Sequence, residues 1–292
     1  MTYNLLTVES LSLDTVTAAL ARCLNVREQE VDVADEDTDQ ELRNWDALVF
    51  CEKATVRGDV STSLDIYVQE SVQPQPSERR LASAFAGVAG TVVLFPAEEV
   101  PPSAYWLATE DGLITRARLY DSDDEEARYV IDRVEAPVSR LPRATVARIP
   151  EVVRELKIAT PVEDLFAAHL HRMFPEETKT PGTAFWEARS SLGAWEKLVR
   201  HMESAWAPSG WCPPDLYLER LEVRDELERV SEQLPAAVSA LMQNALESLD
   251  ALFVELTVDD TGGLLRKELL PAEGAASAHG WWWNRRPEPL PW

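Results

Sequence analysis

Carboxylates are the chemically reactive groups that this sequence supplies in greatest number. The 292 residues include 51 acidic and 28 basic side chains, which gives a formal net charge of -23. Grouped carboxylates can bind calcium, but the acidic runs here lack the Asp-x-Asp-x-Asp-Gly order of a calcium loop. We therefore interpret these runs as solvated loops that attract a basic partner. The residues concerned are Asp35, Glu36, Asp37, Asp39, Asp121, Asp123, Asp124, Glu125 and Glu126.

Cysteine and histidine occur in no pattern that is typical of catalysis or metal binding. Cys23, Cys51 and Cys212 are widely spaced, which indicates buried thiols rather than a disulfide framework or a zinc site. His169 and His171 are two residues apart on an expected helix, so they point to different faces. The motifs G-x-S-x-G and H-E-x-x-H are both absent. We expect no metal and no cofactor, and the sequence favours a binding protein over an enzyme.

Residues 271–292 are rich in tryptophan and proline. Trp281, Trp282 and Trp283 follow one another there, and the prolines exclude a regular helix. Two interpretations are open. The rings dock onto the rest of the chain, or they anchor a partner or a second subunit, because Trp and Arg dominate binding hot spots.

The charge balance indicates what the chain can bind. Nucleic acid is disfavoured as a direct ligand, because binding polyphosphate draws on Lys and Arg. A basic protein is the expected partner, since an acidic surface attracts it over a Debye length of about 8 Å at physiological salt. No stretch approaches the ~18 uncharged apolar residues of a membrane span. Residues 1–10 lack the order of a signal peptide, so we expect a cytoplasmic location.

Short strands and two amphipathic helices are expected in the N-terminal half. Apolar spacing predicts a helix over residues 10–24, and Ser77 and Gly90 are expected to begin and end a second helix. Residues 28–46 are expected to form a solvated acidic loop. Strands are expected over residues 47–53, 60–68, 91–95, 105–108, 113–119 and 129–134.

Helical periodicity dominates the C-terminal half. Thr160 and Glu163 have the spacing of a capping box, with a proline at the first helical position. Further helices are expected over residues 183–206, after residue 215 and from residue 235. Their apolar stripes can bury one another in a bundle.

Together these elements predict an α+β fold, in which an antiparallel sheet with two helices precedes a helical bundle. Three prolines over residues 136–150 indicate a linker. The expected division is an α+β domain over residues 1–135, the linker, a helical domain over residues 151–270 and the Trp/Pro-rich tail over residues 271–292.

A second hypothesis places a ligand pocket between the two halves, where domain interfaces commonly form one. The chain would then be a small-molecule enzyme or a ligand-binding accessory protein. The polar and aromatic candidates for lining this pocket are Tyr67, Tyr105, Trp106, His169, His171 and Trp195.

Two stretches carry a resemblance to known sequence types. Residues 1–150, especially the run YWLA at 105–108 followed by GLITRARL at 112–119, resemble small immunity-type proteins that are encoded beside bacterial polymorphic toxins. Residues 211–292, with FVELT at 253–257 and GWWW at 280–283, look like uncharacterised actinobacterial proteins of the same general kind. The resemblance implies a soluble binding protein with no catalytic motif to carry over.

Overall fold

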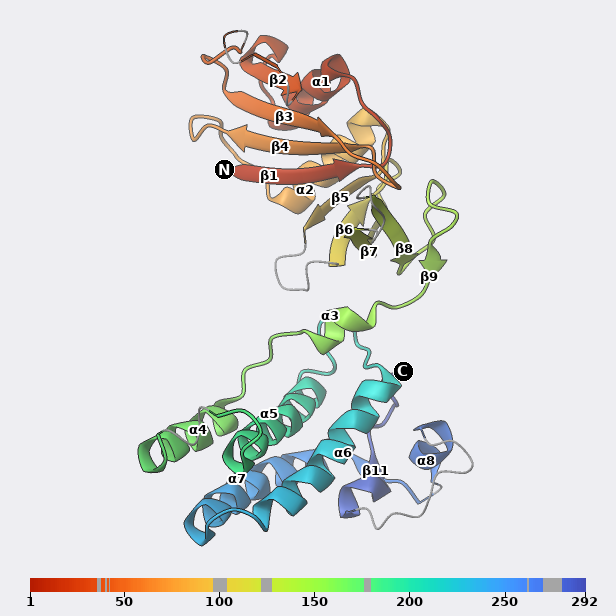
Figure 1. Ribbon diagram of the computed structural model, residues 1–292. Coiled ribbons are helices and arrows are strands. Elements are labelled where there is room, and N and C mark those ends of the chain that lie inside the picture. The colour runs from red at the N-terminus through yellow and green to blue at the C-terminus, as the bar shows by residue number, and fades with distance from the viewer. Residues whose placement is uncertain are drawn as a thin grey trace. The chain divides into compact units, whose positions relative to one another are not determined.

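A mixed β-sheet organises the first of two units into which the chain divides (Figure 1). Unit 1 is Met1–Leu156 and unit 2 is Lys157–Trp292. The computed structural model describes residues 1–35, 38–39, 41, 43–96, 104–121, 128–175, 180–261, 263–269 and 280–292. The chain is therefore of mixed α and β class, as expected from its sequence.

Strands in the sheet of unit 1 follow the order β2-β3-β4-β1-β5-β6-β7-β8-β9. The pairs β2–β3 and β8–β9 are parallel, so the sheet is mixed rather than purely antiparallel. In both pairs a long connection returns the chain to the end at which the first strand began, as parallel pairing requires. The strands are β1 Thr2–Thr7, β2 Val31–Asp35, β3 Val49–Thr55, β4 Thr62–Val68, β5 Val93–Pro96, β6 Ala104–Ala108, β7 Ile114–Asp121, β8 Tyr129–Val134 and β9 Thr145–Val146.

Strands β1 and β2 occupy segments where the sequence predicted none. β1 lies between β4 and β5, with Tyr3, Leu5 and Thr7 buried on one face. β2 lies within the segment 28–46 that was expected to be a solvated loop, and its Val31 is buried. The expectation for that segment is therefore wrong at β2, because apolar residues alternate with its carboxylates.

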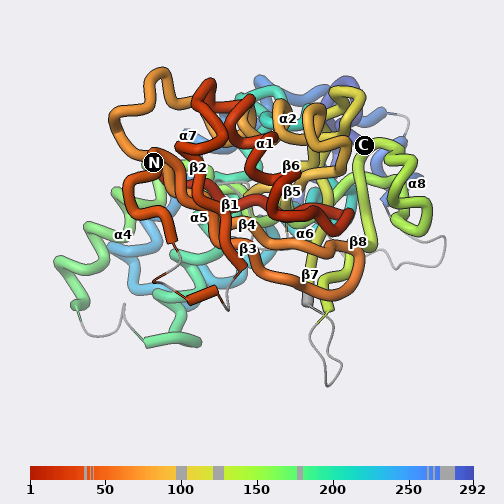
Figure 2. Tube along the Cα trace, turned by 90° about the horizontal axis from the view of Figure 1, so that it is seen from above, coloured from red at the N-terminus to blue at the C-terminus, as the bar shows by residue number. Residues whose placement is uncertain are grey.

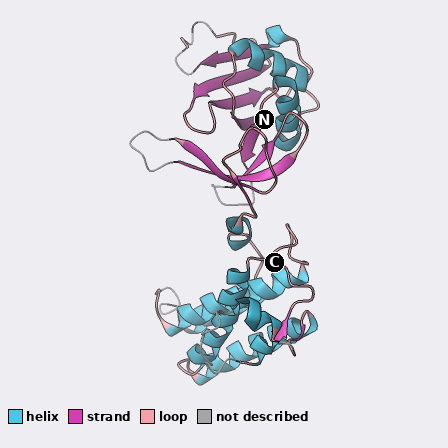
Figure 3. Cartoon of the chain, turned by 90° about the vertical axis from the view of Figure 1, so that its right-hand side faces the viewer, coloured by secondary structure: helices cyan, strands magenta, loops and turns pink. Residues whose placement is uncertain are grey.

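Helices α1 (Leu13–Leu24) and α2 (Glu78–Ala89) lie on the same side of the sheet (Figures 2 and 3). The side chain of Ser12 caps α1 by accepting a hydrogen bond of 3.2 Å from the backbone N–H of Thr15. Ser77 caps α2, and Gly90 ends it in the left-handed conformation, as predicted. Apolar side chains of both helices and of strands β1–β5 form one core cluster between these layers.

A turn between β3 and β4 docks onto β8. The backbone N–H of Tyr129 donates to the carbonyl of Arg57, and the N–H of Asp59 donates to the carbonyl of Tyr129, both at 2.8 Å. The carboxylate of Asp59 also accepts from the N–H of Ile131 at 2.8 Å. Gly58 has φ +114°, and a Cβ at this position would lie 2.1 Å from the Tyr129 carbonyl oxygen. This turn therefore joins two distant strands, and glycine is required in it.

Residues 136–150 belong to unit 1 and are not a linker between the units. Val138 and Leu141 are buried in a second core cluster with residues of strands β5–β8. The guanidinium of Arg140 forms ion pairs with Glu9 at 2.7 Å and Glu110 at 2.8 Å. The prolines in this segment interrupt regular structure, but the residues between them pack on the sheet.

Helices of unit 2 pack on one another, and α5 contacts α4, α6 and α7. The fully buried side chains of unit 2 include Trp195 of α5, Tyr217 of α6 and Phe253 of α7. No helix in the described part of the chain has both the length and the apolar character to cross a membrane. The remaining elements are α3 Pro150–Arg154 in unit 1, and α4 Pro161–Met173, α5 Ala184–Glu203, α6 Pro214–Ser231, α7 Ala236–Glu255, β10 Val258–Asp259, α8 Leu264–Leu269 and β11 Arg285–Arg286 in unit 2.

The first turn of α4 is capped by a different residue than the sequence predicted. Glu196 of α5 is fully buried, and its carboxylate accepts from the backbone N–H groups of Val162 and Glu163 at 3.0 and 2.8 Å. Thr160 precedes the helix but makes no side-chain bond to its backbone. A buried carboxylate at a helix N-terminus satisfies donors that otherwise lack partners, so α4 is held against α5.

Part of the C-terminal segment is built into unit 2. Trp282 and Trp283 are buried, and the guanidinium of Arg224 lies 4.2 Å from the centre of the Trp282 ring. The indole N–H of Trp283 donates to Asp225 of α6 at 2.9 Å. The backbone N–H of Cys212 donates to the carbonyl of Pro291 at 3.1 Å. Residues 280–292 thus complete the core of this unit.

Candidate functional site

One face of strands β1–β4 lies opposite the side covered by α1 and α2 (Figure 3). We call it the open sheet face. Buried residues alternate with exposed ones along β4, where Leu64 and Ile66 face the core and Asp65 and Tyr67 are exposed. Cross-strand register places Phe50 of β3 opposite Tyr67.

Three aromatic rings form a row on the open sheet face. The ring centres of Trp45 and Phe50 are 6.1 Å apart, and those of Phe50 and Tyr67 are 6.4 Å apart. Trp45 is 63% exposed and Tyr67 is 48% exposed. Exposed aromatic rings that contact one another are typical of protein-binding surfaces. We call these residues the aromatic row.

Two carboxylates lie beside the aromatic row. Glu52 follows Phe50 by two residues on β3, and register places it directly opposite Asp65 of β4. Both side chains are exposed, and neither forms an ion pair with any residue that the structure describes. Like charges that face each other across two strands are destabilising. A cation that binds between or beside Glu52 and Asp65 would therefore reduce the repulsion within this acidic pair.

Other carboxylates of the segment 28–46 have partners within unit 1. Asp32 binds Arg43, and Asp35 binds Lys53 at 2.7 Å. Asp39 is exposed and accepts from the backbone N–H of Glu41 at 3.1 Å. Partner binding by this segment stays a prediction, and Asp35 neutralises a lysine instead of facing solvent alone.

Several predicted partner-binding residues lie outside the described residues. They are Glu36, Asp37, Asp123, Asp124, Glu125 and Glu126. Asp121 ends strand β7, but its side chain is not among those that the structure describes. A role for the run 121–126 stays a prediction.

Only one of the three consecutive tryptophans of the C-terminal segment is exposed. Trp281 is 42% exposed, whereas Trp282 and Trp283 lie in the core of unit 2. Of the two interpretations left open by the sequence, docking onto the chain describes Trp282 and Trp283, which contact α6 and are not available as anchors.

Within unit 1, the three residues predicted to line a ligand pocket lie in different environments. Tyr67 belongs to the aromatic row, whereas Tyr105 and Trp106 pack against different core clusters. Guanidinium groups of Arg116 and Arg79 lie 4.3 and 5.2 Å from the Trp106 ring centre.

Within unit 2, the residues predicted to line that pocket also lie in different environments. Trp195 is fully buried and donates to Asp250 at 3.1 Å. His169 and His171 lie on α4, where Nδ1 of His169 is 2.8 Å from the carbonyl oxygen of Leu165. The ligand-binding hypothesis therefore stays a prediction.

Groups that could hold a metal ion are absent from the residues that the structure describes. His201 is buried, which lowers its pKa, and its Nε2 lies 3.0 Å from the carbonyl oxygen of Ala207. Cys51 and Cys212 are buried free thiols. Burial is the main cause that raises the pKa of Cys51, and the charge of Asp65 adds to it. These thiols lack the electropositive, accessible surroundings of a nucleophile.

The reactivity of Cys23 tests whether burial keeps a thiol of this chain protonated. Burial raises the pKa of its thiol from an ordinary 9.0 to about 11. Because only the thiolate reacts, we expect iodoacetamide to modify Cys23 at pH 8 roughly a hundredfold more slowly in the folded chain than in urea. The rate should rise about tenfold per pH unit up to pH ~10. Peptide mass spectrometry measures the modification, and rapid, pH-independent labelling of Cys23 would contradict the prediction.

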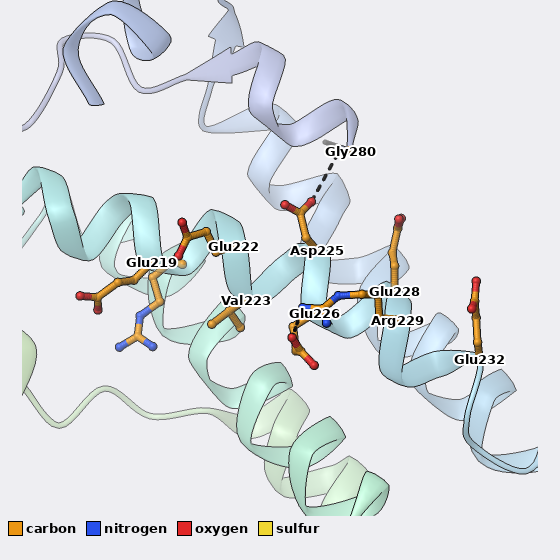
Figure 4. Close-up of a pocket in the computed structure, with 10 residues that line it drawn as sticks. Glu219, Glu222, Val223, Asp225, Glu226, Glu228, Arg229, Glu232 and Gly280 are labelled. Atoms are coloured by element: carbon orange, nitrogen blue, oxygen red, sulfur yellow. Dashed lines mark hydrogen bonds and ion pairs between the residues drawn. The ribbon is translucent and has the colours of Figure 1, made fainter. Parts of the chain in front are cut away.

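A groove on unit 2 gathers further acidic side chains. It has a volume of about 870 Å³ and is lined by Gly280 and one side of α6, including Glu219, Glu222 and Asp225 (Figure 4). Asp225 is committed to Trp283 and to the N–H of Gly280, the latter at 3.4 Å. This α6 groove contributes to the negative field of the chain, but it lacks the aromatic surface that accompanies the acidic pair of unit 1.

No protein-family model, no curated protein and no solved structure matches the chain. A function must therefore be argued from the chemistry of its own residues. The open sheet face combines exposed rings with carboxylates that repel each other, which is the most specific arrangement among the acidic surfaces described above.

Proposed function

We propose that this chain is a non-enzymatic acidic binding protein that recognises arginine on a basic protein partner through the open sheet face. The observation that carries the proposal is that the aromatic row and the acidic pair are neighbours on the same face of β3 and β4. Trp45 and Tyr67 are exposed, and Glu52 and Asp65 are exposed residues beside them.

Arginine has the chemistry that fits this surface best. Its planar guanidinium stacks on aromatic rings and binds a carboxylate through two parallel hydrogen bonds. A lysine ammonium can satisfy the carboxylates but offers no flat surface to the rings. A guanidinium beside Glu52 and Asp65 would also relieve their mutual repulsion. This relief would make the free energy of binding more favourable.

The overall charge supports the same class of partner. A net charge of -23 attracts a cationic protein and accelerates its association at low salt. A partner bound in this way has its own basic surface covered, which is the action of an inhibitor. In this proposal the sheet of unit 1 supplies the contact surface and the helical unit 2 adds to the attracting field.

Synthetic peptides test the proposal on the full chain. One peptide carries four arginines separated by Gly-Ser, and its counterpart carries four lysines. We expect calorimetry at physiological salt to show tighter binding of the arginine peptide. The double variant Glu52→Gln/Asp65→Asn should weaken this binding about tenfold. Trp45→Ala should remove the preference for arginine over lysine.

A matched control separates the surface from the net charge. Glu219→Gln/Glu222→Gln makes the same change in charge in the α6 groove, and we expect it to alter arginine-peptide binding less than about twofold. An equal loss in both double variants would show that only net charge matters and would refute the open sheet face. Capture of one basic protein from bacterial lysate by the wild-type chain, and its loss with Glu52→Gln/Asp65→Asn, would identify the partner.

A further inference from the structure

The open sheet face presents its rings and its carboxylates as two parallel rows. Phe50 and Glu52 are two residues apart on β3, and Tyr67 and Asp65 are two residues apart on β4. Register pairs the two rings with each other and the two acidic residues with each other. Because an antiparallel strand rises about 3.4 Å per residue, the aromatic row and the acidic pair are separated by about 6.8 Å along the strands.

Uncharged residues flank the acidic pair within the sheet. On its two sides, register places Asn4 of β1 and Ala34 of β2. Ala54 and Ser63 are the next residues on the same face of β3 and β4. Arg43 lies nearby in the sequence, but it is bound to a carboxylate of β2. These neighbours leave the charge of the acidic pair for a ligand.

Each row matches one of the two ways in which a guanidinium binds. Stacking on a ring uses the flat face of the group, whereas the parallel hydrogen bonds to a carboxylate use its edge. The aromatic row offers the exposed rings of Trp45 and Tyr67 for the first mode. The acidic pair offers carboxylates for the second. Two arginines can therefore use both modes at once, without competing for one position.

An extended chain has the spacing that the two rows require. Side chains two residues apart on a strand point to the same side and are about 6.8 Å apart. A segment that runs along β3 and β4 can therefore set one arginine over the aromatic row and a second over the acidic pair. The residue between them points away from the sheet. Adjacent arginines point to opposite sides, so only one of them can face it.

We infer that the open sheet face recognises two arginines separated by one residue in an extended segment of the partner. This inference rests on the proposed function and adds to it the arginine spacing and the conformation that the partner must have. The net charge of the chain attracts any basic protein, whereas the two rows select one arrangement of its arginines.

Two peptides of identical composition test the spacing on the full chain. Each contains four arginines, three glycines and three serines. Two residues separate successive arginines in the first peptide, and one residue separates them in the second. We expect calorimetry at physiological salt to show roughly three- to tenfold tighter binding of the second peptide, because its arginines reach both rows together.

The outcomes distinguish failure of the spacing from failure of the proposed function. Equal affinity for the two peptides would overturn the spacing and leave arginine recognition intact. No preference for either peptide over its lysine counterpart would refute the proposed function, and the spacing with it. An alanine-rich helical peptide with arginines four residues apart also presents them about 5–6 Å apart. Tighter binding of this helix than of the second peptide would overturn the extended conformation.

Variants on each row assign the preference to the open sheet face. Tyr67→Ala removes the exposed ring next to the acidic pair, and Glu52→Gln/Asp65→Asn removes the charge of that pair. Either change should bring the ratio of the two peptide affinities to about one, because a single row holds one arginine. Glu219→Gln/Glu222→Gln in the α6 groove should leave the ratio unchanged. A ratio that survives both changes on the open sheet face would refute this location.

Discussion

Replacing Asp250 with Ala is expected to lower the free energy of unfolding of unit 2 by about 3–5 kcal/mol. The carboxylate of Asp250 accepts hydrogen bonds from Nη2 of Arg224 at 2.7 Å and from the Trp195 indole at 3.1 Å. Arg224 is buried, and Trp282 covers one face of its guanidinium. Removal of the carboxylate leaves a buried cation and a buried indole N–H without this acceptor, and both lose their hydration in the folded state.

Urea denaturation followed by tryptophan fluorescence measures this loss, because eight of the ten tryptophans lie in unit 2. Asp259→Ala is the matched control. Asp259 pairs with Arg285 at 2.6 Å, but its side chain is 74% exposed, so its loss should cost less than about 1 kcal/mol. A cost at Asp250 as small as that at Asp259 would show that Arg224 is solvated in the folded chain.

The second large effect is expected in unit 1, where Gly58→Ala should cost about 3 kcal/mol or more. A φ of +114° is unfavourable for alanine, and the new Cβ would lie 2.1 Å from a backbone oxygen of Tyr129. The clash can be relieved only if the turn moves away from β8. This movement breaks backbone hydrogen bonds at Tyr129 and the bond from Ile131 to Asp59.

Alkylation of Cys51 at increasing urea concentration reports on unit 1, because this thiol is buried in its first core cluster. Gly90→Ala serves as the comparison. Gly90 also has a positive φ, of +65°, but a Cβ there meets no atom within 4 Å, so the cost should be only about 1–2 kcal/mol. Equal midpoints for the two variants would mean that the turn does not hold β8 in place.

Local patterns in the sequence were sufficient to predict elements whose signals lie within the element itself. Ser77 and Gly90 mark helix ends through the side chain of the serine and the backbone freedom of the glycine, and they lie at helix ends in the structure. The cap on α4 was not predictable in this way. Glu196 supplies it from another helix, and no local pattern reports which helices will be neighbours.

The candidate site shows the same limit. Alternation along residues 60–68 indicates that Asp65 and Tyr67 share one exposed face. It does not indicate that β3 pairs with β4 in the register that sets Glu52 against Asp65 and Phe50 against Tyr67. Trp45 precedes β3 and offered no periodic signal. The density of carboxylates favoured the neighbouring acidic run as the binding segment, but its Asp35 is paired with Lys53.

Residues 280–292 also determine when each unit can fold during synthesis. All of unit 1 has been translated once Leu156 is added, whereas Trp283 and Pro291 are needed for bonds to Asp225 and Cys212 in unit 2. At roughly 5–20 residues per second, unit 1 has on the order of ten seconds to fold before those residues are made. Once α6 has been translated, its surface that receives Trp282 stays uncovered until that residue is made. Nascent unit 2 is therefore the part of the chain most exposed to aggregation on the ribosome.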